Sequence, residues 1–540
     1  MPNLSDHDLL QMDEDWQSRL PESVVRAVLA RALDDLRQAR DRLNQNPTNS
    51  SRPSGSMAPW AGKSGSQSDR EGEDAAPAQA SEDGVHGSDD EEAPPDSRKA
   101  ETGEDEPQDT TLRARSGPGK LAPGRPGKRR GAQGFGRTQK LAYTHIEQHY
   151  PGQCAACGAI LTTDRQAKAW HGWDSVEFVS PAAALGWQLQ VTRHLLMQQS
   201  CACQHVTRKQ AHRVGMDPLW EKVALGEQRL LGPRLAACIV YLNQRMRLSR
   251  RRVQELMQEF WGLELSIGLL DQTIQQAARA VEPLEDTLTE ELHQAHIVHV
   301  DETSWKEAGL HLWLWVFVSS YTAYMVIGSR AAEMFENVMR QNFAGFLMSD
   351  GYGVYRSREN RLRCWAHLLR KAKGLAESTH QEAQKHGTQC MEHLQTLKRA
   401  IYAARSADPP PREQPVLLEA QTLQTLHRLC ESLREHRHEP LRAFAREMLL
   451  DWEVIMRPLS QPHLPLTNNE AERALRHHVI SRRISHGTRT PEGSRGYALL
   501  ASVFETCRLR FASAIDMLAG TIHAARNGLP LPPLPPIPVA

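Results

Sequence analysis

The chain has 540 residues, of which 40% are hydrophobic and 24% are charged, and its formal net charge at pH 7 is zero. This length predicts roughly three or four domains, and the composition is that of a globular protein. No run of about 18 apolar residues occurs and the acidic N-terminus has no apolar segment, so we expect neither a membrane span nor a signal peptide. We therefore expect a cytoplasmic protein.

The first element is a helix predicted over residues 20–44. Leu29, Leu36 and Leu43 recur every seven residues, which is typical of an amphipathic helix. This repeat fits a short coiled coil that joins two copies of the chain, and it fits a single helix packed on its own protein equally well. Three heptads are too few to separate these alternatives.

A long linker is predicted to follow, over residues 46–142. It is rich in Ser, Gly, Pro and acidic residues and has few large apolar residues, so we expect it to be disordered. Acidic residues dominate 71–109, whereas basic residues dominate 113–140. The basic part could neutralise DNA phosphates without reading sequence, or it could serve only as a solubilising linker.

The cysteines indicate a metal site. The chain has nine, an odd number, and most lie apart, so we expect reduced thiols rather than a disulfide framework. Four form two short-spaced pairs, Cys154 with Cys157 and Cys201 with Cys203, separated by strand-like sequence. This pattern predicts a tetrahedral Zn²⁺ site, which four thiolates would close and make structural. His205 is an alternative ligand if the tight second pair cannot bind.

A helical region with a dense arginine cluster is predicted over residues 217–290. Its spacing is typical of a helix-turn-helix in which the helix that opens near Ser266 reads DNA and arginines bind phosphates. A helical bundle that only connects the neighbouring parts explains the same pattern. The candidate DNA contacts here are Arg250, Arg251 and Arg252.

Short runs of β-branched and aromatic residues over 294–357 predict a mixed sheet. Asp301 and Asp350 are expected at the ends of two of its strands, and Gly351 would permit a sharp turn after the second. The following stretch, 361–457, is predicted to be helical.

A further helix is predicted over 468–483, with Asn468 as its N-cap and Glu472 in its first turn. Two aspartates and a later glutamate can hold two Mg²⁺ ions, which would stabilise the attacking and leaving oxygens of a phosphodiester exchange. Glu470 competes for the third position, but it points to another side of the helix. Taken alone, each carboxylate also fits a loop, a turn or a surface ion pair, such as Glu472 with Arg476.

Several stretches together resemble the IS66-type insertion-sequence transposases, a DDE class with a ribonuclease H-like catalytic core. They are HVDETSWK, SDGYGVYR, RCWAHLLRKAKG, NNEAERALR, the cysteine-containing YPGQCAACGAIL and VTRHLLMQQSCACQ, and the helical GPRLAACIVYLNQRMRLSRRRVQELM. Thr467 stands where this family often has Asp, and residues 482–509 keep only the family's outline of basic residues, glycines and a closing helix. These departures affect the expected recognition of DNA ends rather than the chemistry.

The resemblance implies that Asp301, Asp350 and Glu472 bind the Mg²⁺ ions and that Cys364, Trp365 and His367 lie where a helical insertion leaves the core. The implied activity is cleavage at the ends of an insertion sequence and transfer of the freed 3′-OH into target DNA. The implied partners are DNA, further copies of the chain and small accessory proteins of the same element. Alternatives are a DNA-binding relative without catalysis and a nuclease that cuts but does not join. Expected contacts to the DNA backbone are Arg473, Arg476, Arg482 and Arg483.

The expected fold class is therefore multidomain α+β, with a ribonuclease H-like core preceded by a zinc-ribbon-like module and a helical DNA-binding region. The expected parts are the N-terminal helix (1–45), the linker (46–142), the zinc module (143–206), the helical region (217–290), the catalytic core (291–485) with its insertion (about 366–460), and a C-terminal helical segment with a proline-rich tail (486–540).

Overall fold

The computed structural model describes residues 22–44, 139–162, 166–180, 186–212, 222–224, 229–407 and 415–538. Nearly all of the expected linker over 46–142 lies outside these residues. The described part mixes helices with sheets, which confirms the α+β class. None of its helices is long and apolar enough to cross a membrane.

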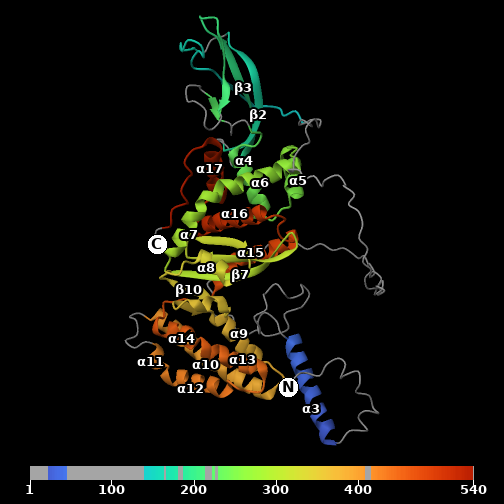
Figure 1. Cartoon of the computed structure of the whole chain (residues 1–540), viewed down its shortest axis with the longest axis vertical. Helices are drawn as coiled ribbons and strands as arrows, with labels where there is room; N and C mark the ends of the chain where they lie inside the picture. The colour runs from blue at the N-terminus through green and yellow to red at the C-terminus, as the bar shows by residue number, and fades with distance from the viewer. Residues whose placement is uncertain are drawn as a thin grey trace, which may run out of the picture. The chain divides into compact units, whose positions relative to one another are not determined.

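The central sheet has five strands in the order β11-β10-β7-β8-β9 (Figure 1). Its first three strands along the chain form an antiparallel meander, and the last two run parallel to β7. The expected mixed sheet is confirmed, but β11 falls in a stretch expected to be helical. It is only three residues long and has no alternating pattern, so its pairing with β10 makes it a strand. The strands are β7 (Ile297–Glu307), β8 (Leu310–Val318), β9 (Ala323–Gly328), β10 (Phe346–Ser349) and β11 (Arg361–Arg363).

Alternating side chains of β7 divide the sheet into two faces. Val298 and Val300 are buried on the face that packs against α6, α7 and α8, together with η3 (Glu282–Leu284) and η4 (Gly353–Ser357). His299 and Trp305, at the odd positions, contact α15 on the other face. The helices named here are α6 (Ile267–Val281), α7 (Glu285–His293), α8 (Ala332–Val338) and α15 (Asn469–Ser485). Asp301 is also at an odd position, so the same alternation places it on the face that packs against α15.

The helix, turn, helix and third helix that the sequence predicts before the sheet are α4 (Pro233–Gln244), α5 (Arg250–Trp261) and α6. Ser249 and Ser266 cap α5 and α6 through their side chains. Leu270 of α6 packs in a core shared with α4 and α5, whereas Ala277 packs in the core under the sheet. α6 therefore connects these two cores, and α16 (Pro491–Leu509) and α17 (Ala514–Asn527) pack against it.

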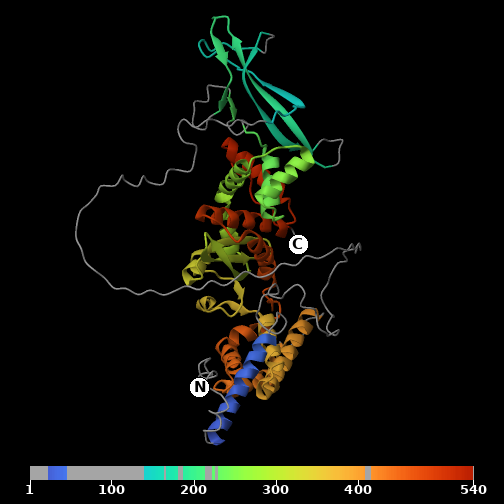
Figure 2. The same cartoon turned by 90° about the vertical axis from the view of Figure 1, so that its right-hand side faces the viewer.

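A group of helices lies between β11 and α15 in the chain and has a hydrophobic core of its own (Figure 1 and Figure 2). Trp365 belongs to this core, and its indole N–H donates to the carbonyl of Ile455 at 2.9 Å. The helices are α9 (Trp365–Ala376), α10 (Gln381–Ser406), α11 (Pro415–Leu418), α12 (Ala420–Leu433), α13 (Glu439–Leu450) and α14 (Trp452–Ser460).

The cysteine-containing region is a small sheet in which β3 (Gln188–Ser200) pairs with β1 (His145–His149), β2 (Lys168–Val179) and β4 (Val206–Arg208). Its apolar side chains Val176 and Phe178 pack against α4, α5 and α6. Glu177 accepts hydrogen bonds from the amides of Arg234 and Leu235 and so caps α4. Two further short strands, β5 (Gln210–His212) and β6 (Lys222–Ala224), pair in parallel.

The predicted N-terminal helix is confirmed as α3 (Glu22–Asn44). Leu29 and Leu36 of the heptad repeat have relative exposures of 58% and 55%, so the described residues do not bury them. Near the other end of α3, Asp41 accepts hydrogen bonds from Ser378 and Thr379.

Candidate active site and metal centres

Asp301 lies inside β7 rather than at the strand end that the sequence predicts. The parallel pairing of β7 with β10 stops at His299, but the hairpin with β8 continues to Glu307 and keeps this segment extended. Oδ1 of Asp301 accepts a hydrogen bond from the amide of Glu302 at 2.9 Å. Burial raises the pKa of Asp301 well above its usual value, and the charges of Asp350, Glu302 and Glu472 raise it further.

Asp350 directly follows β10, and its Oδ1 accepts a hydrogen bond from the amide of Tyr352 at 2.8 Å. Gly351 comes next, but its φ angle is not positive, so the backbone angle does not explain the glycine. A Cβ at this position would collide with the guanidinium of Arg363 and approach Glu447 to 2.9 Å. These two side chains therefore leave no room for a Cβ here unless they move.

Glu472 lies in the first turn of α15, as the sequence predicts. Asn468 precedes this helix, but its side chain makes no capping hydrogen bond. Its Nδ2 donates to the carbonyl of Val300 at 2.8 Å, and its Oδ1 lies 3.2 Å from Nδ1 of His299. Asn468 thus fastens the start of α15 to β7 beside Asp301.

The three carboxylates are separate in sequence and come together through the sheet and α15. Burial raises the pKa of Asp301 most and the charges of Asp350 and Glu472 add to it, so the site gathers negative charge at one place. The side chain of Glu470 does not join this group. Its carboxylate lies 3.2 Å from the guanidinium of Arg473 at the surface.

The start of α9 faces Glu472. Nη2 of Arg370 lies 3.6 Å from a carboxylate oxygen of Glu472, and Nε2 of His367 lies 4.0 Å from the same oxygen. Burial, aided by the charge of Arg370, lowers the pKa of His367 to about 4, so its imidazole is neutral at physiological pH. Cys364 accepts a hydrogen bond from the amide of Asn468 at 3.3 Å. The sequence indicates the position of His367, but not that it adjoins Glu472.

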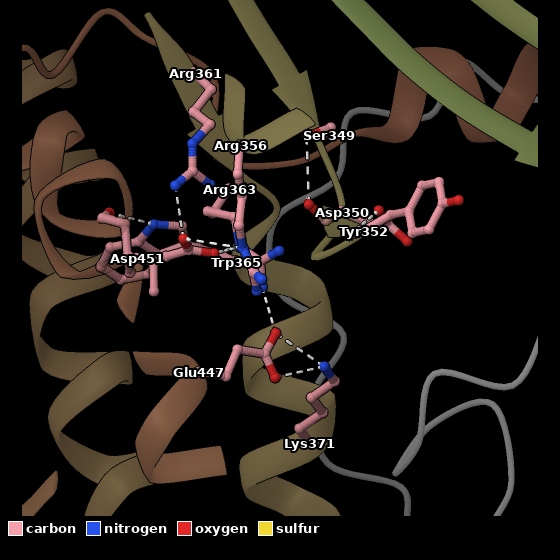
Figure 3. Close-up of polar contacts among 11 residues, drawn as sticks. Ser349, Asp350, Tyr352, Arg356, Arg361, Arg363, Trp365, Lys371, Glu447 and Asp451 are labelled. Atoms are coloured by element: carbon pink, nitrogen blue, oxygen red, sulfur yellow. Dashed lines mark hydrogen bonds and ion pairs between the residues drawn. The ribbon is translucent and has the colours of Figure 1, made fainter. Parts of the chain in front are cut away.

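A network of charged side chains from the helical insertion lies under the Asp350 turn (Figure 3). Arg363 is 2% exposed and pairs with Glu447 and, at 3.4 Å, with Asp451. Arg361 pairs with Asp451 at 2.7 Å, and Lys371 pairs with Glu447 at 2.7 Å. Sequence reasoning missed Glu447 and Asp451, because the helical pattern around them contains no motif.

Glu302 is a further acidic group that sequence reasoning did not place in the site. It lies on the opposite face of β7, where it accepts a hydrogen bond from the hydroxyl of Tyr355 at 2.6 Å and pairs with Arg330 at 2.7 Å. Burial raises the pKa of Glu302, and the charge of Asp350 adds to this. Its hydrogen bonds hold η4 and the residues after β9 close to the Asp350 turn.

The four predicted cysteine ligands converge. The Sγ atoms of Cys154 and Cys203 are 3.7 Å apart, those of Cys157 and Cys201 are 3.5 Å apart, and all four lie within 4.8 Å of one another. A tetrahedral Zn²⁺ with Zn–S bonds of about 2.3 Å places sulfurs about 3.8 Å apart, so the arrangement fits this ion. His205 takes part through its backbone carbonyl, which accepts from the amide of Cys201 at 2.9 Å.

The expected DNA contacts occupy different environments. Arg250 pairs with Asp271 at 2.6 Å and Arg252 with Glu255 at 2.7 Å, and all of these side chains are solvent-exposed. Arg482 is half-buried and donates to Thr303 at 2.8 Å, so it holds α15 on β7. The remaining arginines of this group are exposed, namely Arg251, Arg473, Arg476 and Arg483. Because α6 packs in two cores, it fits the connecting alternative better than a recognition helix.

Comparison with known proteins agrees with this arrangement. Residues 228–496, which include α4–α6, the central sheet, the helical insertion and α15, match the transposase IS66 family. A curated relative from Sinorhizobium fredii (strain NBRC 101917 / NGR234), described as uncharacterized protein y4qI, is 25% identical over 299 residues. This match covers 50% of the chain, and the chain spans 55% of the relative's length. Through its matching domain, the chain belongs to the IS66 family of transposases.

Proposed function

We propose that this protein is a DNA transposase that cuts at the ends of an insertion sequence and joins them to target DNA, with two Mg²⁺ ions bound by Asp301, Asp350 and Glu472. The observation that carries this proposal is the position of these carboxylates: the pairing of β7 with β10 brings Asp350 beside Asp301, and Glu472 in the first turn of α15 is near enough for its charge to act on the buried Asp301. The family match supports the general activity and the use of a divalent metal.

The sheet supports the proposed ribonuclease H-like core. Three antiparallel strands are followed by two strands parallel to the first, in the order β11-β10-β7-β8-β9. In this topology β7 is central, so Asp301 lies beside the end of its neighbour β10, where Asp350 follows. This strand order and the position of Asp350 beside Asp301 support the proposed core.

The donor set fits Mg²⁺. All three groups offer carboxylate oxygens, the ligands that this ion prefers. Burial first, and then the charges of neighbouring carboxylates, raise the pKa of Asp301, and a bound cation would offset both effects. When bound, the two ions would activate the attacking oxygen and stabilise charge on the phosphate. Asp301, Asp350 and Glu472 would hold the ions through their carboxylate oxygens.

Basic groups around the carboxylates would hold the DNA. Arg370, beside Glu472, can bind a phosphate oxygen next to the reacting centre. The exposed side chains of Arg473, Arg476 and Arg483 on α15 can bind the backbone further away. The arginine-rich start of α5, at Arg250–Arg252, would add contacts of the same kind, because phosphate binding needs exposed charge rather than a recognition helix.

We also propose that Arg363 positions Asp350. Its guanidinium, which Glu447 and Asp451 hold from the insertion, packs against Gly351 directly after this aspartate (Figure 3). Residues that orient metal ligands in this way affect metal affinity strongly without contacting the ion. The insertion would thereby help to set the distance between the metal-binding carboxylates.

The cysteine-containing region would bind a structural Zn²⁺ through Cys154, Cys157, Cys201 and Cys203. The spacing of the four sulfurs supports this proposal. Among the described residues, the core shared with α4–α6 reaches along β3 only to Val191, so the ion would help to hold the cysteine end of the sheet together.

The proposed function can be tested with purified protein, Mg²⁺ and labelled DNA of the element's ends. We expect nicked ends and strand-transfer products, both absent with Asp301→Asn. Nicks without joining would identify a nuclease instead. Binding without either product would identify a DNA-binding relative that does not catalyse.

A further inference from the structure

A second group of metal-ligand side chains lies in the cysteine-containing region, away from the four cysteines. It consists of Glu147 and His149 on β1 and His194 on β3, whose donor atoms all lie within 4.8 Å of one another. β1 and β3 run parallel with Glu147 opposite His194, and residues 147 and 149 lie on the same face of β1. The strand pairing itself therefore brings the three side chains together.

The distances between donor atoms fit one bound ion. Nε2 of His149 lies 3.1 Å from Nδ1 of His194, and Oε2 of Glu147 lies 3.3 Å from the same nitrogen. A tetrahedral ion with metal–nitrogen and metal–oxygen bonds of about 2.0–2.2 Å places its donors about 3.3–3.5 Å apart. The two observed separations are close to this spacing, so small movements would suffice for binding.

Neighbouring side chains orient the imidazoles as a metal site requires. The hydroxyl of Ser175 lies 2.9 Å from Nε2 of His194, and a hydrogen bond from this nitrogen to Ser175 leaves the lone pair of Nδ1 facing Glu147 and His149. Trp173 stacks on both imidazoles, with ring centroids at 4.6 Å from His194 and 5.8 Å from His149. His194 is only 9% exposed, so its ring is held in place.

We propose that Glu147, His149 and His194 bind a second divalent ion of the Zn²⁺ class. Two nitrogens and one oxygen suit this ion, and three protein ligands leave one position open. The Glu147 side chain is 53% exposed, so solvent reaches the cluster.

The second site would act on a different part of the region from the four cysteines. His194 precedes Cys201 by seven residues along β3, which is roughly 20 Å in an extended strand. β1 leads into the turn with Cys154 and Cys157, and β3 leads into the turn with Cys201. An ion between β1 and β3 would therefore fasten together the two strands that carry the cysteine turns.

Metal titration of the full chain, prepared without a polyhistidine tag, tests this proposal. The protein is stripped of metal and titrated with Co²⁺ under reducing conditions, in excess Mg²⁺ so that carboxylate sites do not contribute. We expect two tight equivalents, of which one shows thiolate-to-cobalt charge-transfer absorption. Cys201→Ser should remove that absorption and keep the other equivalent. His149→Gln should keep the charge-transfer absorption and remove the other equivalent. Glu147→Gln should weaken the binding of that other equivalent about tenfold or more.

His171→Gln is the matched control, because it removes an exposed histidine of β2 outside the cluster and should leave two equivalents. Far-ultraviolet circular dichroism checks that each variant folds. If His149→Gln does not fold, Glu147→Gln decides the question, since its side chain is half exposed and the change keeps its shape. A single equivalent in the unaltered protein, or two unweakened equivalents in Glu147→Gln, would overturn the proposal and leave a histidine pair held only by hydrogen bonding and stacking.

Discussion

At the scale of single residues, the folded protein without metal disfavours the ionised form of Asp301. Burial, together with the carboxylates of Asp350, Glu302 and Glu472, raises its pKa above the unfolded value of about 4. The native state therefore holds this proton more tightly than the unfolded chain does. The contribution of Asp301 to stability is complete below the unfolded pKa and is lost as pH rises through the folded pKa.

Asp301→Asn should therefore stabilise the metal-free protein at neutral pH, by about 1 kcal/mol, while abolishing cleavage. Thermal unfolding without Mg²⁺ between pH 4 and pH 8 measures the first effect, which should shrink toward the acidic end. Added Mg²⁺ should stabilise the original protein more than the variant. A variant that is less stable throughout, or that still transfers strands, would contradict the proposed role of Asp301.

The two glutamates at the start of α15 provide a comparison within one turn of helix. Glu472→Gln should lower Mg²⁺-dependent cleavage by about 100-fold or more, because it removes a negative ligand next to the reacting phosphate. Glu470→Gln changes a side chain paired with Arg473 at the surface and should leave the rate nearly unchanged. Initial rates at saturating DNA decide between them, and the opposite ranking would assign the ligand to Glu470.

At the scale of elements, the helical insertion meets the sheet through buried charges instead of apolar contacts alone. Arg363 comes from the end of β11, Lys371 from α9 and Glu447 from α13, and these groups pair directly under the turn that follows β10 (Figure 3). Removing one partner of a buried pair leaves an uncompensated charge, which is costly. This contact makes the geometry at Asp350 depend on the position of the insertion.

Arg363→Gln should raise the Mg²⁺ concentration needed for half-maximal cleavage by about tenfold. Arg510→Gln is the matched control, because Arg510 is also 2% exposed and paired with a glutamate, Glu291, but contacts β9 and its neighbours through Tyr321 and Thr322. Both variants should lose about 3–5 kcal/mol of stability, and only Arg363→Gln should change the Mg²⁺ requirement.

Mg²⁺ titrations of the two variants, at a temperature where both are folded, separate positioning from stability. If Arg363→Gln is too unstable, Glu447→Gln tests the same contact while keeping the shape of the side chain. An equal Mg²⁺ requirement in all proteins would mean that the network only stabilises the fold.

At the scale of the whole molecule, the exposed leucines of α3 bear on self-association. Leu29 and Leu36 lie one heptad apart and are more than half exposed, so pairing with a second copy would bury them. Leu29→Glu with Leu36→Glu should reduce the oligomer to a smaller species in size-exclusion chromatography with light scattering. Ala30→Glu with Arg37→Glu has the same spacing one position further along the helix and should have no such effect. Equal masses for both pairs would exclude α3 as the contact.

Much of the local structure could be predicted from the sequence, because it depends on neighbouring residues. The strands β7–β10, the helix with Glu472 and the paired cysteines follow from periodicity and spacing over a few residues. β11 could not be predicted in this way, since three residues hold no pattern and only β10 makes them a strand. The role of Asn468 could not be predicted either, because its side-chain amide donates to the backbone of β7 instead of capping α15.

The sequence by itself determined the family, the α+β class and the residue types of the carboxylate and cysteine sites, since motifs and periodicity are properties of short segments. Only the tertiary structure decided which groups share a site. Asp301 faces α15 because of its place in the alternation of β7, Arg363 packs its guanidinium against Gly351, and Glu147 meets His194 through strand register. These are contacts between residues far apart in the chain, and the free energy of such contacts depends on packing that no short segment encodes.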